Sequence, residues 1–290
     1  MQVLFQQLNE NSSLLFTSVF ILGLLIGSFL NVVIFRVPKI LEQDWHLQCA
    51  HLLEDKKRIA ELEAEEKITL STPNSTCPKC QHAIKPWENI TIISYLFLKG
   101  KCSQCKSPIS LRYPCIELTT AILSLITIFY FGASYAGLAA LAITWTLIAL
   151  TMIDTDTQLL PDNMTLPLLW LGLILNAFTT FTTLESALWG AIFGYLSLWS
   201  VYWLFKLLTG KEGMGYGDFK LLAALGAWFG WQLLPIIILV SSVVGAVIGI
   251  SMILVKGKDK NIPIPFGPYL AIAGWITLIW GEQLKYIWLG

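Results

Sequence analysis

Two short acidic segments lie at the ends of long apolar stretches and could supply a pair of carboxyl groups. Asp154 and Asp156 follow the apolar stretch 118–153, and Asp218 follows the glycine-rich run Gly213-Met214-Gly215-Tyr216-Gly217. Two carboxyl groups that share a site do not both ionise readily, so one can stay protonated while the other is charged. The charged group can take a proton from water while the neutral group protonates a carbonyl, which is the chemistry of an aspartic peptidase.

The residue types alone leave the membership of this pair open. Asp154 and Asp218 are the preferred pair, and Asp156 is a credible substitute for Asp154, although two helical positions turn its side chain about 200° away. Asp162 stands directly before the apolar stretch that begins at residue 163, where a helix N-cap is the structural expectation.

The glycines before Asp218 favour a role in binding substrate. Gly215 and Gly217 carry no Cβ, so an extended peptide could approach the backbone closely beside them. A nucleotide-binding loop is the alternative, but no strand precedes these glycines and no acidic partner for a ribose follows, so that signal is weak.

Four cysteines form two closely spaced pairs, Cys77-Pro78-Lys79-Cys80 and, after twenty-one residues, Cys102-Ser103-Gln104-Cys105. Each pair can supply two corners of a tetrahedral zinc site, and a site of four thiolates leaves no open position for catalysis. Structural disulfides or a redox motif are the alternatives. A reducing cytoplasm and the absence of a βαβ pattern favour zinc, held for structural purposes by Cys77, Cys80, Cys102 and Cys105.

The composition indicates where these residues must be held. The chain has 290 residues, of which 55% are hydrophobic and 13% charged, and its mean hydropathy is +0.65. A soluble domain carries about a quarter charged residues, so the chain is predicted to be an integral membrane protein. The 19 basic and 19 acidic residues balance, which argues against a nucleic-acid partner.

Six stretches are free of charged residues: 11–35, 118–153, 163–184, 186–205, 221–255 and 261–281. A membrane span needs roughly 20 residues, so four of them are single spans and two are long enough for two spans each. Glycine-containing turns are expected at 132–137 and 230–235. The predicted fold is an all-α polytopic membrane protein with about eight transmembrane helices.

The distribution of Lys and Arg predicts the orientation, because cytoplasmic loops are enriched in both. Residues 1–35 contain neither, whereas residues 36–112 contain twelve, so the N-terminus is expected in the periplasm. Three parts follow: a first span at 1–35, a cytoplasmic domain at 36–117 with an amphipathic helix at 51–67 and the zinc site, and a seven-span domain at 118–290. Both aspartates of the preferred pair then face the cytoplasm.

Several motifs together resemble those of the bacterial type IV prepilin leader peptidase family, whose bifunctional members also serve type II secretion. They are Gly27-Ser28-Phe29-Leu30-Asn31-Val32-Val33, both cysteine pairs, Ser110-Leu111-Arg112-Tyr113-Pro114, the segment 154–162, Gly215-Tyr216-Gly217-Asp218 and Pro265-Phe266-Gly267-Pro268. The Gly-x-Gly-Asp element is also found in presenilin-like intramembrane peptidases. Its combination with two cysteine pairs is more specific, and the resemblance covers nearly the whole chain.

The resemblance implies that Asp154 and Asp218 are the catalytic pair, which decides between Asp154 and Asp156. It implies prepilin and pseudopilin substrates, whose positively charged leader is cut on the cytoplasmic side after a glycine. Family members of this form then methylate the new N-terminal amine with S-adenosylmethionine, for which the sequence locates no site. A bacterial inner membrane is the implied location, with lipid bilayer as partner, and the sequence does not indicate an oligomeric state.

Two other classes of function were weighed against this enzyme. A membrane transporter would carry acidic residues inside its spans, but the six apolar stretches contain no charged residue. A zinc-stabilised scaffold without enzymatic activity agrees with the four cysteines, and an assay of leader cleavage separates it from the peptidase.

Overall fold

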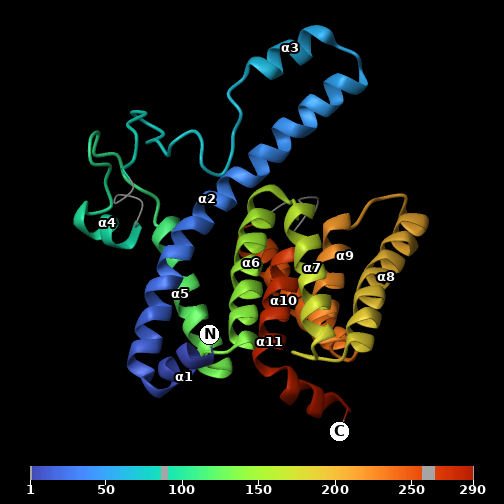
Figure 1. Cartoon of the computed structure of the whole chain (residues 1–290). Helices are drawn as coiled ribbons and strands as arrows, with labels where there is room; N and C mark the ends of the chain where they lie inside the picture. Colours follow the sequence, from blue (N-terminus) through green and yellow to red (C-terminus); the bar gives the residue numbers. More distant parts are fainter. Residues whose placement is uncertain (1, 86–90, 257–264, 290) are drawn as a thin grey trace. The chain divides into compact units, whose positions relative to one another are not determined.

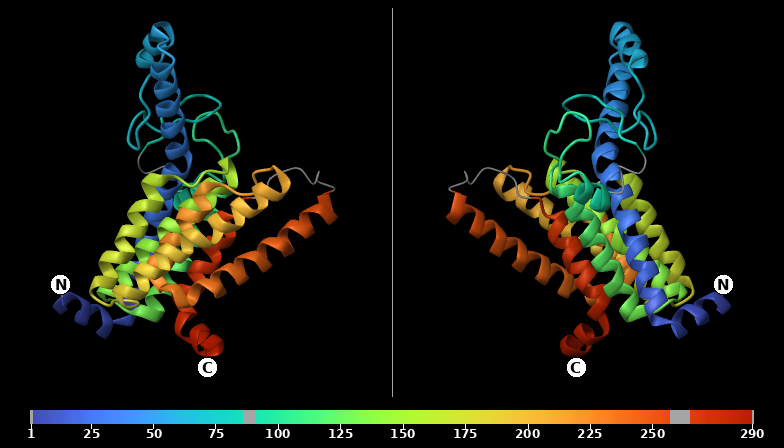
Figure 2. Two further views of the ribbon diagram at one scale, coloured as in Figure 1. Left: turned by 90° about the vertical axis from the view of Figure 1, so that its right-hand side faces the viewer. Right: turned by 90° about the vertical axis from the view of Figure 1, so that its left-hand side faces the viewer.

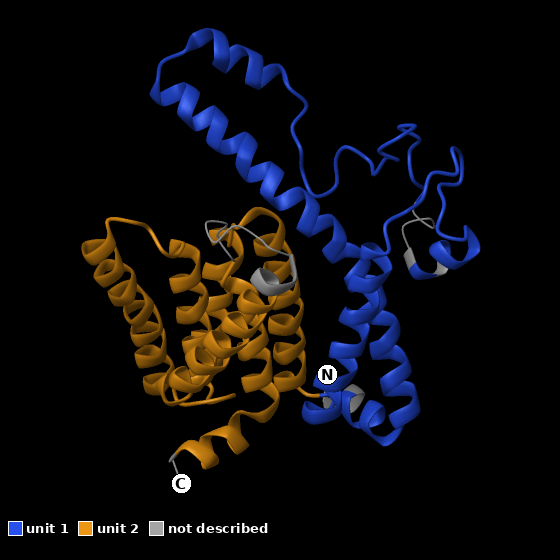
Figure 3. Cartoon of the chain, turned by 180° about the vertical axis from the view of Figure 1, so that it is seen from behind, with its two compact units in different colours: residues 1–133 blue, residues 134–290 orange. Residues whose placement is uncertain are grey.

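Helices make up most of the computed structural model, which describes residues 2–85, 91–256 and 265–289 (Figure 1). Within those ranges the strand-type pairing consists of two isolated antiparallel bridges, Thr76 with Ala83 and Lys101 with Pro108. The predicted all-α fold is therefore confirmed. The chain divides into two compact units, Met1–Ala133 and Ser134–Gly290 (Figure 3), while the predicted division at residues 35 and 117 stays a prediction.

The first unit contains five helices: α1 (Gln2–Glu10), α2 (Ser12–Leu52), α3 (Lys56–Ala64), α4 (Thr91–Phe97) and α5 (Arg112–Phe131). The second unit contains α6 (Tyr135–Thr157), α7 (Asp162–Ala177), α8 (Leu184–Thr209), α9 (Tyr216–Phe229), the short 3-10 helix η2 (Trp231–Leu233), α10 (Leu234–Lys256) and α11 (Gly267–Leu289).

Five helices of the described chain are long and apolar enough to cross a membrane: α2, α5, α6, α8 and the segment Trp231–Ser251, which contains η2 and most of α10. The remaining apolar stretches form α7, α9 and α11. Since α7 has 16 residues and α9 has 14, both are shorter than the roughly 20 residues of a full span. The count of eight spans therefore stays a prediction.

Glycines separate the helices at both of the predicted turns. Gly132 ends α5 with φ +62° and Gly230 ends α9 with φ +84°, values that a residue with a Cβ rarely adopts. After each glycine a new helix begins, α6 in the first case and η2 followed by α10 in the second. The two long apolar stretches are thus each divided where the sequence predicts.

Close packing of α2 against α5 holds the first unit together. A Cβ on Gly23 would lie 2.6 Å from Ala121 Cα, and a Cβ on Gly27 would lie 2.6 Å from Glu117 Cα. Small residues four positions apart let two apolar helices approach where no hydrophobic effect drives them together. The two glycines therefore set the distance between these helices.

Enlarging one of these glycines should weaken the first unit. Gly23→Leu is expected to lower its free energy of unfolding by about 1–3 kcal/mol, the usual cost of overpacking, because the leucine would collide with the α5 backbone. Leu25→Ala, on an exposed position of the same helix, is the matched control and should change little. Thermal unfolding in detergent measures both, and a Gly23→Leu variant as stable as its parent would contradict this packing.

Helix α2 extends well beyond the apolar stretch that ends at residue 35. The helix continues through Pro38 to Leu52, and the predicted amphipathic helix at 51–67 is wrong in its bounds. The chain turns at Glu54, whose φ is +52°, and Asp55 caps α3 by accepting from Arg58 N–H. The C-terminal part of α2 and α3 thus form a hairpin (Figure 2).

A buried arginine ties the segment after α3 back to α2. Arg36 is buried, and its guanidinium donates to the carbonyl of Thr69 over 2.8 Å and to the carbonyl of Pro73. A buried cation needs such acceptors to offset its loss of hydration. Arg36 therefore fixes where the chain leaves the hairpin on its way to the cysteine pairs.

Helix α9 lies at the centre of the second unit. Its residues from Asp218 to Phe229 are buried except Lys220, and it packs against α7, α8 and α11. Gly190 of α8 and Gly226 of α9 approach so closely that a Cβ on either would collide with the other backbone. Asn176 of α7 donates to the carbonyls of Ala227 and Trp228 over 2.8 and 3.0 Å, which fixes the far end of α9.

Candidate active site and metal centre

Asp154 lies in the last turn of α6, where it is 4% exposed. The helix ends after Thr157, because Gln158 adopts a left-handed conformation and its N–H donates to the carbonyl of Asp154. The carboxylate itself accepts from the main-chain N–H of Gly267, with 3.0 Å between Gly267 N and Asp154 Oδ2. Asp154 is thus a buried carboxyl group with a fixed orientation.

Asp218 lies in the first turn of α9 and is 7% exposed. Its main-chain N–H donates to the carbonyl of Gly215 over 3.3 Å, which closes the turn that starts the helix. Its Oδ1 is buried and has no hydrogen-bond partner among the residues that the structure describes. A buried carboxyl oxygen of this kind is costly unless it serves a function.

The two carboxyl groups lie close enough for the charge of Asp154 to act on Asp218. Leu160, in the turn between α6 and α7, packs against the start of α9, which carries Asp218, and against Gly267, whose N–H binds Asp154. A Cβ on Gly217 would lie 2.7 Å from Leu160 Cβ, and a Cβ on Gly267 would lie 3.1 Å from Leu160 Cδ1. The ends of α6, α9 and α11 therefore converge around this side chain, as the pairing of the two aspartates requires.

Aromatic rings hold the start of α9 in place. The ring centroids of Tyr216 and Phe219 are 5.4 Å apart, and Tyr202 of α8 lies 5.2 Å from the first and 5.7 Å from the second. One turn along α8 from Tyr202, Lys206 forms an ion pair of 2.8 Å with Glu212 in the loop before α9. This pairing lowers the pKa of Glu212. These contacts join the start of α9, and with it Asp218, to α8.

The other acidic residues of this region lie outside the buried pair. Asp156 is exposed. Asp162 is the first residue of α7 after Pro161 at the N-cap, so the expected capping role is wrong. Its two oxygens instead each lie 2.7 Å from Nζ of Lys220. Because Lys220 follows Asp218 by two residues, this ion pair links the turn after Asp154 to the helix that carries Asp218.

The two glycines that were expected to approach substrate differ in their surroundings. A Cβ on Gly215 would meet Asp218 Oδ2 at 3.8 Å, an ordinary contact. Gly217 lies inside α9, and its contact with Leu160 already requires a residue without a side chain. A role in substrate binding stays a prediction for both, and Gly217 has a packing role in addition.

The two cysteine pairs adopt the same local structure. Gln81 N–H donates to the carbonyl of Cys77 over 2.8 Å, and Lys106 N–H donates to the carbonyl of Cys102 over 3.2 Å. Gln81 and Lys106 have φ values of +55° and +58°. Each pair therefore sits on one tight turn that directs both thiols of the pair to the same side.

The four thiols meet in one cluster. All sulfur atoms lie within 4.8 Å of one another, with 3.8 Å between Cys77 and Cys105 and 4.0 Å between Cys80 and Cys102. Four thiolates around one zinc ion at about 2.3 Å would be roughly 3.8 Å apart. The cluster thus has the donor set and the spacing of a tetrahedral metal site.

The cysteines remain thiols, as a metal site requires. All six cysteines are free, and Cys49 and Cys115 lie outside the cluster. Main-chain N–H groups of Cys80 and Lys79 lower the pKa of Cys77 to about 6, so its thiolate form is available to a metal at neutral pH.

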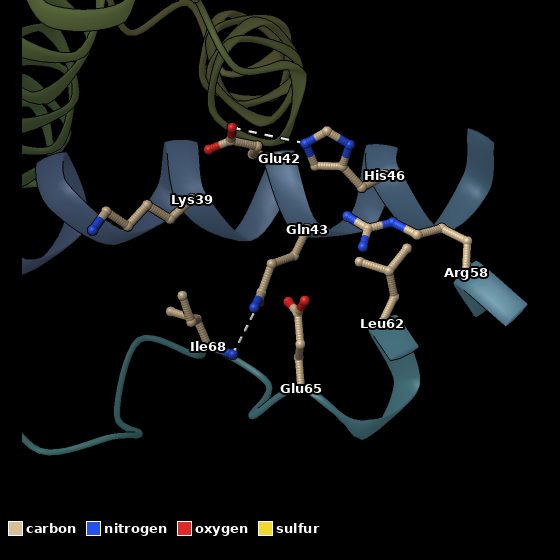
Figure 4. A pocket seen from close by; sticks show the side chains of 8 residues that line it. All are labelled: Lys39, Glu42, Gln43, His46, Arg58, Leu62, Glu65 and Ile68. Atoms are coloured by element: carbon tan, nitrogen blue, oxygen red, sulfur yellow. Dashed lines mark hydrogen bonds and ion pairs between the residues drawn. The ribbon is translucent and has the colours of Figure 1, made fainter. Parts of the chain in front are cut away.

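A pocket of about 300 Å³ lies in the hairpin of the first unit (Figure 4). Gln43 spans it by accepting from Ile68 N–H over 3.1 Å, and Leu62 and Ile68 supply its apolar surface. The charged side chains around it have both signs and are exposed: Lys39, Glu42, Arg58 and Glu65. It lacks the buried apolar surface that an adenine ring needs, so it does not fit S-adenosylmethionine.

Three features of the site were not predicted from the sequence. The Gly267 N–H, the packing of Leu160 and the ion pair of Lys220 with Asp162 each join residues far apart in the chain. The sequence did offer a signal for the first, since Gly267 belongs to the motif Pro265-Phe266-Gly267-Pro268.

Comparison with known proteins agrees with this site. Residues 21–131 match the bacterial peptidase A24 N-terminal domain, and residues 141–250 match the type IV leader peptidase family. A protein from Pseudomonas aeruginosa named prepilin leader peptidase/N-methyltransferase is 57% identical over 272 residues, covering 93% of this chain and 91% of that protein.

Proteins of the same name from other bacteria are similar over the same length. The one from Stutzerimonas stutzeri is 57% identical over 93% of this chain and 92% of its own length, and the one from Legionella pneumophila is 45% identical over 92% of each. No solved structure matches the chain significantly. At these identities and coverages, the chain belongs to the type IV leader peptidase family.

Proposed function

We propose that this chain is a membrane aspartic endopeptidase that removes the leader of type IV prepilins and pseudopilins after a glycine. We further propose that it methylates the new N-terminal amine with S-adenosylmethionine as donor. The observation that carries the proposal is the convergence of two buried aspartates, Asp154 and Asp218, in a chain whose relatives are named for both activities.

In the proposed cleavage the two aspartates divide the acid and base roles. The ionised carboxylate takes a proton from a water molecule, whose oxygen attacks the scissile carbonyl carbon. The protonated carboxyl gives its proton to the carbonyl oxygen, which forms a neutral tetrahedral intermediate. When this intermediate collapses, the carbon–nitrogen bond breaks and a proton passes to the leaving amine, so neither a metal nor a covalent intermediate is needed.

The proposed location is the bacterial inner membrane, with the N-terminus in the periplasm and the dyad facing the cytoplasm. Eighteen of the nineteen Lys and Arg residues then lie on the cytoplasmic side, with Lys285 as the exception, as expected for cytoplasmic loops. A prepilin that is still anchored by its apolar helix would present its scissile bond at that membrane surface.

The four clustered cysteines are proposed to hold a structural zinc ion. Zinc suits four thiolates in tetrahedral geometry, and with no coordination position left over the ion would stabilise the loop rather than take part in cleavage. The basic side chains along this segment would offset the negative charge of a zinc tetrathiolate: Lys79, Lys85, Lys99, Lys101 and Lys106.

The product masses of one prepilin test the two activities together. With purified protein alone, the expected product lacks its leader and is otherwise unchanged. With S-adenosylmethionine added, the expected product is heavier by one methyl group. A prepilin that keeps its leader under both conditions would contradict the peptidase, and a cut product that never gains a methyl group would contradict the second activity.

The ion pair between Asp162 and Lys220 should affect the cleavage rate because it positions the two aspartates, rather than because it stabilises the fold. Exposed ion pairs contribute about 0–1 kcal/mol to folding, but this one joins the turn after Asp154 to the helix of Asp218. Lys220→Met is expected to lower the rate of leader removal about tenfold, or roughly 1.4 kcal/mol in activation free energy. The double variant Asp162→Lys/Lys220→Asp should recover part of that loss.

Arg58→Met is the matched control for this ion pair. It breaks the exposed pair of Arg58 with Glu61 on α3 and should leave the cleavage rate unchanged. Equal rates for Lys220→Met and its parent, measured at saturating prepilin, would show that the link between α7 and α9 does not position the dyad.

A further inference from the structure

Gly267 begins α11 and directs its main-chain N–H at the proposed dyad. The N–H donates to Asp154 Oδ2 in a buried bond of 3.0 Å. A Cβ at this position would lie 2.6 Å from the same oxygen and 3.1 Å from Asp154 Cγ. A residue with a side chain would therefore push the carboxyl group away, so glycine is what permits this close donor.

The two aspartates differ in the groups that surround their oxygens. Asp154 Oδ2 receives the Gly267 N–H, whereas Asp218 Oδ1 is buried with no partner among the described residues. A hydrogen bond to a carboxylate favours its charged form, and burial without a donor favours the protonated form. Asp218 also lies in the first turn of α9, where the partial positive charge of the helix N-terminus favours its charged form. A helix end stabilises an anion less than a direct N–H donor does.

Other titratable or charged groups near Asp154 lie on its own helix and on three neighbouring helices. They are Asp156 on α6, Asp162 on α7, Asp218 and Lys220 on α9, and Tyr269 on α11. Asp162 and Lys220 neutralise each other in their ion pair, Asp156 is exposed, and the Tyr269 ring packs beside Gly245. Asp218 is thus the group whose protonation responds to the charge of Asp154.

We propose that Gly267 is a positioning residue of the dyad. Its N–H holds Asp154 as the charged carboxylate that activates the water and leaves Asp218 as the acid that protonates the scissile carbonyl. This assignment rests on the proposed peptidase function, because it divides the roles within the same dyad.

Gly267→Ala tests the positioning. The added Cβ should displace the Asp154 carboxylate, so the kcat of leader cleavage should fall at least about tenfold while KM stays within about twofold. Because the charged form of Asp154 loses its donor, the acidic limb of the pH–rate profile should move to higher pH and the alkaline limb should stay. Methylation of a pilin supplied without its leader should be unchanged.

Gly274→Ala is the matched control, because Gly274 lies on the same helix as Gly267 but away from the carboxyl groups. Its Cβ would meet the side chain of Leu225 on α9 at 2.5 Å. It should keep the parent kcat and pH profile. A folded Gly267→Ala variant with the parent kcat and acidic limb would overturn the proposal, and so would a shift of the alkaline limb in place of the acidic one.

An infrared difference spectrum tests the assignment without any glycine variant. The spectrum of the parent minus that of Asp218→Asn at pH 7 should contain a protonated carboxyl band. A carboxylate band in its place would overturn the assigned roles. Failure of the peptidase function itself would be distinct, because the parent protein would then leave the leader on the prepilin.

Discussion

Asp154→Asn and Asp218→Asn should each abolish leader removal. Asparagine keeps the size of the side chain but can neither accept the proton of water as a base nor donate a carboxylic proton. General acid–base catalysis contributes on the order of 10²–10⁴-fold, so each variant should lose at least that factor. Because the two groups act as a unit, the double variant should be little worse than either single one.

Asp156→Asn is the matched control for these variants, since it makes the same chemical change two residues from Asp154 on an exposed position. It should cleave at the parent rate. The rate of leader loss from one prepilin, measured for all four proteins with thermal unfolding to verify folding, makes the comparison. Loss of activity in Asp156→Asn with activity retained in Asp154→Asn would move the dyad to the alternative residue.

Removing the metal should unfold the cysteine segment while leaving cleavage largely intact. Structural zinc sites contribute about 10–16 kcal/mol to the folding of small domains, and in the described part of the segment from Cys77 to Cys105 only the short helix α4, two turns and two isolated bridges could replace it. Cys77→Ser, or chelation of the parent, is expected to release about one zinc ion per chain. Proteolysis within this segment should then accelerate at least about tenfold.

Cys115→Ser is the matched control, because Cys115 is a free thiol outside the cluster. It should keep its zinc and its resistance to protease. Metal analysis and limited proteolysis give the readouts, with leader cleavage measured on the same samples. Immediate loss of cleavage on chelation, with the membrane helices still folded, would contradict a purely structural role.

Local sequence was sufficient to predict the elements of this fold where one strong signal decides the conformation. Gly132 and Gly230 end helices because each adopts a positive φ, and long apolar runs form helices on both sides of them. The bounds of α2 and α3 were harder to predict, since the charged residues after 35 support a helix as well as a loop. Asp55 marks the start of α3 as its N-cap, but this role can be assigned only once the turn at Glu54 is known.

The candidate site shows the same division between local and tertiary information. Residue types and spacing indicated Asp154, Asp218 and the four cysteines, because their chemistry is specific. The Gly267 N–H and the ion pair of Lys220 join positions 113 and 58 residues apart, so no local pattern contains them. A glycine or lysine on its own carries many alternative roles, and only the folded chain shows which partner each one meets.

The most direct test of the central claim is the mass spectrum of two substrates incubated together with Asp154→Asn and S-adenosylmethionine. One substrate is an intact prepilin and the other is the same pilin supplied without its leader. The account predicts that the intact prepilin keeps its leader while the pre-cut pilin gains one methyl group, which also shows that the variant is folded. Leader loss from the intact prepilin at a rate near that of the parent would contradict the account.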